Sequence, residues 1–169
     1  YLSHNLKLNI VKEAAKIQKL LPSISLKTAR INSQEVSKND IFFAIKGKKN
    51  DGNKFVRQSF NRKASLAVVN NIQNRLDTKR QIKVKNTLSF LTDVSKIFRK
   101  SIETNIIAIT GSCGKTTLKE LIGNTLSKIS KTSFSPKSYN NKFGVPLSLF
   151  NLDENDEFGI LEVGMDKKG

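Results

Sequence analysis

The sequence predicts an α/β protein of two units: a small α/β unit, then the first part of a doubly wound parallel-sheet domain with a phosphate-binding loop. Three observations predict this fold class. Short apolar runs of strand length occur at residues 41–45, 66–69 and 106–109. Segments with apolar residues at helical spacing separate these runs. A glycine-containing loop at residues 111–117 stands directly between a strand-like run and a helix-like segment.

The first unit is predicted to open with an amphipathic helix over residues 6–21, which Pro22 ends. A buried strand over residues 40–45 follows, and Gly47 and the Asp51–Gly52 pair are turn signals after it. A short helix is expected at residues 55–63. Two further strands are expected at residues 66–69 and 82–84, which completes a small α/β unit.

The second unit is predicted to open with a helix that Asn86 caps. The apolar run at residues 106–109 suits a central parallel strand. The helix after the loop is expected over residues 117–129. Its apolar face consists of five residues: Leu118, Leu121, Ile122, Thr125 and Ile129. A last strand at residues 158–163 contains an acid, Glu162. We place the boundary near Lys85, which gives units of residues 1–84 and 85–169.

The second unit holds about half of the elements of a doubly wound domain, whose parallel sheet needs cover on both faces. We therefore expect Gly169 to be a truncation point. The chain begins with Tyr1 and not with Met, so we expect the native N-terminus to be missing as well.

The net charge of +16 allows two interpretations. A nucleic-acid partner is one, but the lysines are dispersed along the chain and no base-stacking aromatic motif accompanies them. A lysine-rich surface, with an anionic nucleotide as substrate, is the interpretation we favour, and we expect no nucleic-acid partner. No apolar run approaches a membrane span, no signal peptide is visible, and the single cysteine fits a reducing cytosol. We expect a cytoplasmic monomer.

The loop supplies what phosphate binding needs. Glycines let backbone N–H groups approach a phosphate, and the helix N-terminus adds its partial positive charge. Lys115 can reach the outer phosphates, and the Thr116 hydroxyl can ligate Mg²⁺. This loop has two residues between its glycines where the general pattern has four. The alternatives are a plain glycine turn that caps a helix and, for Cys113, a catalytic thiol, although no His partner is visible.

Glu162 comes near the end of a predicted strand, at the edge where open α/β sheets gather ligands. A carboxylate there can hold Mg²⁺ opposite Thr116, although a solvated acid at a strand end is the alternative. Asn140 and Asn141, taken alone, indicate only a polar turn before a helix.

The combination resembles the Mur ligases. Residues 109–117 are similar to their ATP loop, residues 140–146 to a stretch of the member that adds D-alanyl-D-alanine, and residues 161–165 to its metal-binding segment. Residues 40–47 and 51–55 resemble the family's uridine-nucleotide domain. The resemblance runs from about Ile31 to the end of the chain. Asn32, Ser33 and Gln34 stand where the family has an Asp-Ser-Arg-like signature, and Asn53 stands where a His is frequent.

The resemblance implies an ATP-dependent amide-bond ligase that uses Mg²⁺ and joins D-alanyl-D-alanine to UDP-N-acetylmuramoyl-tripeptide through an acyl phosphate. It implies catalytic roles for Lys115, Asn140 and Asn141, and metal binding by Thr116 and Glu162. The implied ATP contacts are Thr110, Gly111, Ser112, Cys113, Gly114, Lys115, Thr116 and Thr117. The implied contacts to the uridine substrate are Asn32, Ser33, Lys46, Gly47 and Asn53.

Family members are more than twice as long as this chain, so we expect the chain alone not to complete the ligation. Three other functions remain open at this point. One is a sibling ligase that adds another amino acid, or a folylpolyglutamate synthase. The second is a basic nucleic-acid-binding NTPase, and the third is a nucleotide-binding regulatory module without catalysis.

Overall fold

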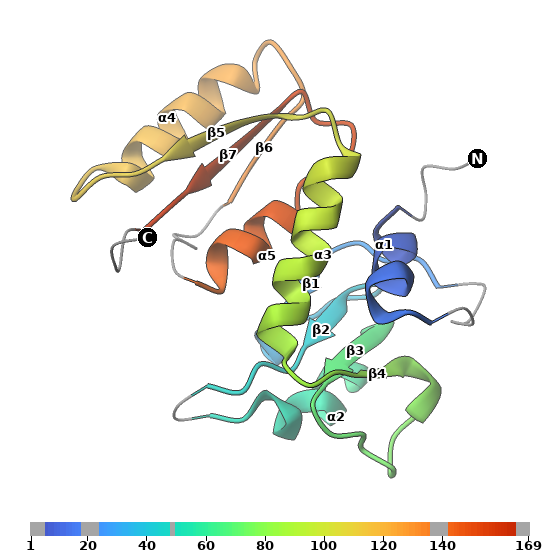
Figure 1. Cartoon of the computed structure of the whole chain (residues 1–169). Coiled ribbons are helices and arrows are strands. Elements are labelled where there is room, and N and C mark those ends of the chain that lie inside the picture. Colours follow the sequence, from blue (N-terminus) through green and yellow to red (C-terminus); the bar gives the residue numbers. More distant parts are fainter. Residues whose placement is uncertain (1–5, 18–23, 48–49, 136–141, 165–169) are drawn as a thin grey trace. The chain divides into compact units, whose positions relative to one another are not determined.

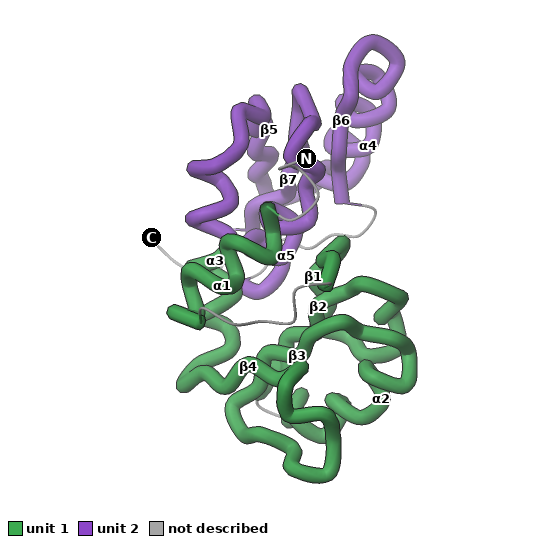
Figure 2. The backbone as a smooth tube through the Cα atoms, turned by 90° about the vertical axis from the view of Figure 1, so that its right-hand side faces the viewer, with its two compact units in different colours: residues 1–94 green, residues 95–169 purple. Residues whose placement is uncertain are grey.

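The computed structural model describes residues 6–17, 24–47, 50–135 and 142–164 (Figure 1). The chain divides into two compact units, Tyr1–Val94 and Ser95–Gly169 (Figure 2). Each unit has its own sheet, and every strand pair in both sheets is parallel. The predicted α/β fold class is confirmed. None of the helices within the described ranges has the length and hydropathy of a membrane span.

The first unit has a four-stranded sheet in the order β1-β2-β3-β4. The strands are β1 (Ala29–Arg30), β2 (Ile41–Phe43), β3 (Leu66–Val69) and β4 (Gln81–Lys83). Helix α1 (Leu6–Ala15) precedes the strands, and the short 3₁₀ helix η2 (Ser33–Glu35) lies between β1 and β2. The 3₁₀ helix η3 (Gly52–Phe55) and helix α2 (Val56–Asn61) lie between β2 and β3. The 3₁₀ helix η4 (Thr78–Arg80) leads into β4. The sequence predicts three of these strands and misses β1, which has only two residues.

Helix α1 ends earlier than predicted. Lys16 has a φ of 54°, which is left-handed. The Lys16 N–H donates to the Glu13 carbonyl, and the Ile17 N–H donates to the Lys12 carbonyl, both at 3.0 Å. This pair of bonds is the Schellman arrangement that closes a helix. Residues 18–23, where the predicted helix would continue, lie outside the described residues.

The core of the first unit is formed by its apolar strands. All residues of β2 and β3 are buried, as expected for a parallel sheet covered on both faces. Phe43 also contacts Phe90, with ring centroids 6.4 Å apart, and the Thr87 hydroxyl donates to the Ala44 carbonyl at 3.2 Å. These two contacts join the end of β2 to the segment that contains Thr87 and Phe90.

Helix α3 (Thr87–Ser101) belongs to both units, because the division falls between Val94 and Ser95. Asn86 caps it as predicted, since its Oδ1 accepts from the Ser89 N–H at 2.9 Å. The boundary between the two compact units thus lies inside α3, whereas the sequence places it between residues 84 and 85. That domain boundary stays a prediction.

The second unit has a three-stranded sheet in the order β5-β7-β6. Its elements are β5 (Asn105–Ile109), α4 (Lys115–Leu126), β6 (Thr132–Phe134), α5 (Gly144–Phe150) and β7 (Phe158–Glu162). Because β7 inserts between β5 and β6, β5 lies at an edge of the described sheet and not at its centre, contrary to the sequence interpretation. Only Ile109 of β5 is buried.

The predicted apolar face of α4 is wrong. Leu118, Leu121 and Ile129 are 46%, 64% and 80% exposed, whereas Lys119 and Gly123 are buried. The helix packs against β6 and β7 through this second face. A Cβ on Gly123 would lie 2.5 Å from the Phe134 ring, so a glycine is what permits the close approach of α4 to β6.

Candidate nucleotide-binding site

The loop between β5 and α4 has the backbone that the sequence predicts for phosphate binding. Gly111 has a φ of 147° and Gly114 a φ of 75°, a range that side chains with a Cβ rarely adopt. Gly114 is the N-cap of α4, so the first free N–H groups of the helix adjoin the loop. Residues 110–114 are exposed. The loop therefore presents backbone donors and a helix N-terminus to solvent.

Lys115 is the first residue of α4, and its side chain turns back over the loop. Its Nζ donates to the Gly111 carbonyl at 2.5 Å. This bond holds the ammonium group above the backbone that would cradle a phosphate. Thr116 follows in the same first turn and is half-buried, and Cys113 is an exposed free thiol.

The sheet register brings Glu162 beside the start of the loop. Ile109, the last residue of β5, pairs with Glu162 of β7, and the Val163 N–H donates to the Ile109 carbonyl at 2.8 Å. Both strands therefore end at the same edge of the sheet. Glu162 is buried, which excludes the interpretation as a solvated strand-end acid.

The Glu162 carboxylate has a partner that the sequence analysis missed. Lys119 Nζ lies 3.0 Å from Glu162 Oε1, and the two side chains are 0% and 2% exposed. Lys119 follows Lys115 by one helical turn, so both lie on the same face of α4. A lysine at that position looks like a solvated helix residue in the sequence, and only the strand register places an acid under it.

The residues fit the divalent cation that the loop motif implies. No hydrogen bond from the described residues reaches either carboxylate oxygen of Glu162, although both are buried, and such atoms are rare in folded proteins. Carboxylate and hydroxyl oxygens are ligands that Mg²⁺ prefers, and Mg²⁺ usually keeps several waters or takes phosphate oxygens as well. Within the described ranges no cluster of three or more acidic, His or Cys side chains could hold a metal ion alone.

Asn140 and Asn141 lie outside the described residues, so their roles stay predictions. The helix that follows them, α5, is firmly placed within the second unit. The Ser95 hydroxyl donates to the Pro146 carbonyl at 2.7 Å, and Phe98 contacts Phe150 edge-on with ring centroids 5.5 Å apart.

The first unit carries the residues predicted to bind a uridine substrate, and the structure places them on two loops. Asn32 caps η2, because its Oδ1 accepts from the Gln34 N–H at 3.0 Å and its Nδ2 donates to Glu35 at 3.2 Å. The Ser33 hydroxyl is buried and donates to Gln58 at 2.6 Å. These contacts shape the loop after β1.

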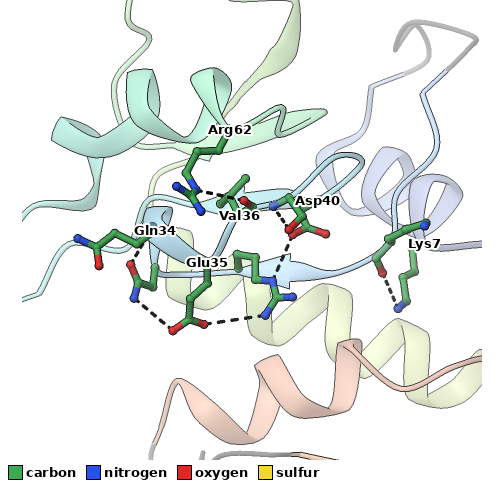
Figure 3. A network of polar contacts seen from close by, with 10 residues as sticks. Lys7, Gln34, Glu35, Val36, Asp40 and Arg62 are labelled. Carbon is green, nitrogen blue, oxygen red and sulfur yellow. Dashed lines mark hydrogen bonds and ion pairs between the residues drawn. The ribbon is translucent and has the colours of Figure 1, made fainter.

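Polar contacts around Asp40 hold this loop in place (Figure 3). Asp40 Oδ2 accepts from the Ser37 N–H at 2.9 Å and from Arg30 Nε at 3.2 Å. The same Arg30 lies 3.9 Å from Glu35. Arg62 donates to the Val36 carbonyl at 3.3 Å. An acid and a guanidinium therefore hold the loop, but they belong to Asp40 and Arg30 and not to the signature positions 32–34.

Asn53 has a structural role. Its Oδ1 accepts from the N–H groups of Asn70 and Asn71 at 3.1 and 3.4 Å. Its Nδ2 donates to Asp51 at 2.7 Å and to Asn70 Oδ1 at 3.5 Å. These bonds fill the hydrogen-bonding capacity of the amide. A contact between Asn53 and a substrate stays a prediction.

Lys46 and Gly47 lie in the segment between β2 and η3, which also contains Asp51. Lys46 pairs with Asp51 in an isolated antiparallel bridge, and the Gly47 N–H donates to the Asn50 carbonyl at 2.8 Å. Hydrogen bonds from the Asn53 side chain and backbone hold the pKa of Asp51 below its ordinary value, and the nearby Lys46 contributes.

A cavity of about 440 Å³ adjoins Asn53. Three basic side chains, Lys54, Arg57 and Arg75, line it together with Ile72, Leu76 and polar residues. The cavity is suited to an anionic ligand with an apolar part, and it lies within the first unit.

The parallel α/β architecture, the Gly-x-x-Gly-Lys-Thr loop and the buried acid beside it are typical of a nucleotide-binding domain. The family model described as the Mur ligase middle domain matches residues 109–169 of the chain.

Among the members of this family, the chain is similar to ligases that add D-alanyl-D-alanine. It is 34% identical over 166 residues to the UDP-N-acetylmuramoyl-tripeptide--D-alanyl-D-alanine ligase of Haemophilus influenzae. The aligned residues cover 94% of this chain and 36% of the relative. A solved structure of the corresponding ligase from Acinetobacter baumannii matches 95% of this chain and 36% of that one, with 28% identity and a TM-score of 0.77. The MurF ligase of Thermotoga maritima in complex with ADP matches 85% of this chain and 33% of that one, with 27% identity and a TM-score of 0.67.

The chain thus spans about a third of the length of the curated relatives that it matches.

Proposed function

We propose that this chain supplies the ATP-binding and uridine-nucleotide-binding parts of a ligase of peptidoglycan precursor synthesis. The ligase joins D-alanyl-D-alanine to UDP-N-acetylmuramoyl-tripeptide in the cytoplasm and acts as a monomer. The observation that carries the proposal is the loop with Lys115 at its mouth, beside the buried carboxylate of Glu162. The names of the relatives support the choice of substrates.

The reaction proceeds in two steps. The substrate carboxylate attacks the γ-phosphate of ATP, the bond to the β-phosphate oxygen breaks, and an acyl phosphate and ADP form. The amine of D-alanyl-D-alanine then attacks the acyl carbon, loses a proton and releases phosphate, which leaves the amide. The protein's task in the first step is to position the phosphates and to stabilise their charge.

The chain's residues divide this task. The backbone of residues 110–117 holds the phosphates, and Lys115 leaves the Gly111 carbonyl to stabilise charge on the transferred phosphoryl group. Thr116 and Glu162 would hold Mg²⁺, which would supply positive charge to the phosphates. The proposal also assigns catalytic roles to Asn140 and Asn141, which lie outside the described residues. The loops with Asn32, Ser33, Lys46, Gly47 and Asn53 bind the uridine substrate.

Lys115→Ala tests the proposal through nucleotide affinity. A hydrogen bond to a charged group contributes about 1.5–3 kcal/mol, so we expect the affinity of the chain for ATP with Mg²⁺ to fall about 10- to 100-fold. Isothermal titration calorimetry measures this affinity. Lys128→Ala is the matched control, because Lys128 is an exposed lysine just after the same helix. Equal affinities in both variants would contradict the loop assignment.

A further inference from the structure

Lys119 and Glu162 form a buried ion pair next to the nucleotide loop. Their charged atoms are 3.0 Å apart, and the two side chains are 0% and 2% exposed. Taking two charges out of water is costly, and apolar residues of similar volume often stabilise a core at least as well. The pair therefore calls for an explanation beyond stability.

The pair is asymmetric. Lys119 Nζ makes its ion pair with Oε1 of Glu162, whereas Oε2 has no such ion pair with the described residues; both oxygens are buried, and neither accepts a hydrogen bond from the described residues. Lys119 thus holds the carboxylate by one oxygen and leaves the other for a further ligand. Its backbone lies one helical turn from Lys115, on the helix that the loop begins.

The charges of these side chains disfavour a free divalent cation. Lys115 and Lys119 carry two positive charges against the one negative charge of Glu162, which leaves one net positive charge. Without a nucleotide, a cation that approaches Glu162 meets a carboxylate whose charge Lys119 already neutralises. The phosphates of a bound nucleotide reverse the sign of the local charge, and only then is a divalent cation attracted.

We propose that Lys119 is a positioning residue that fixes the Glu162 carboxylate and makes divalent-cation binding at this carboxylate depend on a bound nucleotide. The inference rests on the proposed function, because it takes Glu162 as a ligand of the cation. It assigns to Lys119 a role that the loop motif does not include. The site thereby takes its cation together with the nucleotide.

Direct Mn²⁺ binding to the 169-residue chain tests this proposal, measured by electron paramagnetic resonance without nucleotide. Lys119→Met removes the charge and keeps a side chain of similar length. We expect the nucleotide-free affinity for Mn²⁺ to rise at least tenfold in Lys119→Met, and this gain to vanish in the double variant with Glu162→Gln. An unchanged nucleotide-free affinity in Lys119→Met would overturn the proposal.

Lys131→Met is the matched control. Lys131 pairs with Asp153 at 3.1 Å in the same unit, but this pair is about half exposed. Its loss removes an equal charge at a site without a cation role. We expect no change in Mn²⁺ affinity in this variant, and a gain equal to that of Lys119→Met would show a nonspecific charge effect and overturn the proposal.

Lys119→Met leaves the Glu162 charge buried without its counter-ion and can fail to fold. In that case, the wild-type chain and Glu162→Gln still decide the question. We expect Mg²⁺ alone to leave the melting temperature of the wild type unchanged. We expect Mg²⁺ with ATP to raise the melting temperature of the wild type by more than it raises that of Glu162→Gln. A rise with Mg²⁺ alone that is lost in Glu162→Gln would refute the dependence on nucleotide.

These measurements separate the two proposals. A wild-type chain that binds no ATP with Mg²⁺ contradicts the proposed function. A wild-type chain that binds ATP with Mg²⁺, together with nucleotide-free Mn²⁺ affinity that is the same in the wild type and Lys119→Met, contradicts only the role of Lys119.

Discussion

Gly52 is the residue of the Asp51–Gly52–Asn53 segment whose substitution should damage the first unit most. A Cβ at this position would lie 2.6 Å from the Ala44 carbonyl carbon and the Ile45 nitrogen. These atoms are backbone, so no side chain can swing away. Gly52→Ala must therefore move η3 away from the end of β2, which stretches the 3.1 Å hydrogen bond from the Gly52 N–H to the Ile45 carbonyl.

The expected cost follows from these contacts. Overpacking costs about 1–3 kcal/mol, and a hydrogen bond contributes about 1 kcal/mol. We expect Gly52→Ala to lower the free energy of unfolding by about 3 kcal/mol, which corresponds to a drop of about 6–12 °C in melting temperature for a chain of this size. Circular dichroism at 222 nm is the suitable signal, because the chain contains no Trp.

Gly47→Ala is the matched control in the same loop. Among the described residues, a Cβ on Gly47 would meet only the Asn50 carbonyl oxygen, at 3.4 Å. We expect a change of less than about 1 kcal/mol, because the substitution also reduces the conformational entropy of the unfolded chain. Equal melting temperatures for Gly52→Ala and Gly47→Ala would refute the steric reasoning.

Two further predictions concern other contacts. Gly123→Ala should destabilise the second unit, because the clash with Phe134 outweighs the gain of about 1 kcal/mol in helix propensity. In a Phe134→Leu background, the same substitution should instead stabilise the unit. Urea denaturation measures the free energy of unfolding in both backgrounds. The pKa of Asp51 is lowered by hydrogen bonds from Asn53, so its contribution to stability is fully present above its ordinary pKa of 3.8 and is lost as the pH falls through the lowered value. Asp51→Asn should therefore destabilise the chain at pH 6 and have less effect at pH 2, and an effect of the same size at both values would contradict the role of this carboxylate.

Much of the fold could be predicted because its signals are local. The apolar runs that became β2, β3 and β7, the Asn86 cap and the glycine loop each depend on residues that are neighbours in sequence. The early end of α1 could not, because the left-handed Lys16 is a lysine and not the usual glycine. The face of α4 was also mispredicted, because apolar spacing alone indicates a buried stripe.

The sequence by itself determined the α/β class, the phosphate loop with Lys115, and the resemblance that names the family. Only the tertiary structure decided the neighbours of the loop. The insertion of β7 between β5 and β6 aligns Ile109 with Glu162, and the packing of α4 through Gly123 places Lys119 over that acid. The physical reason is that strand register and helix rotation are set by contacts between residues far apart in the chain, to which local patterns do not respond.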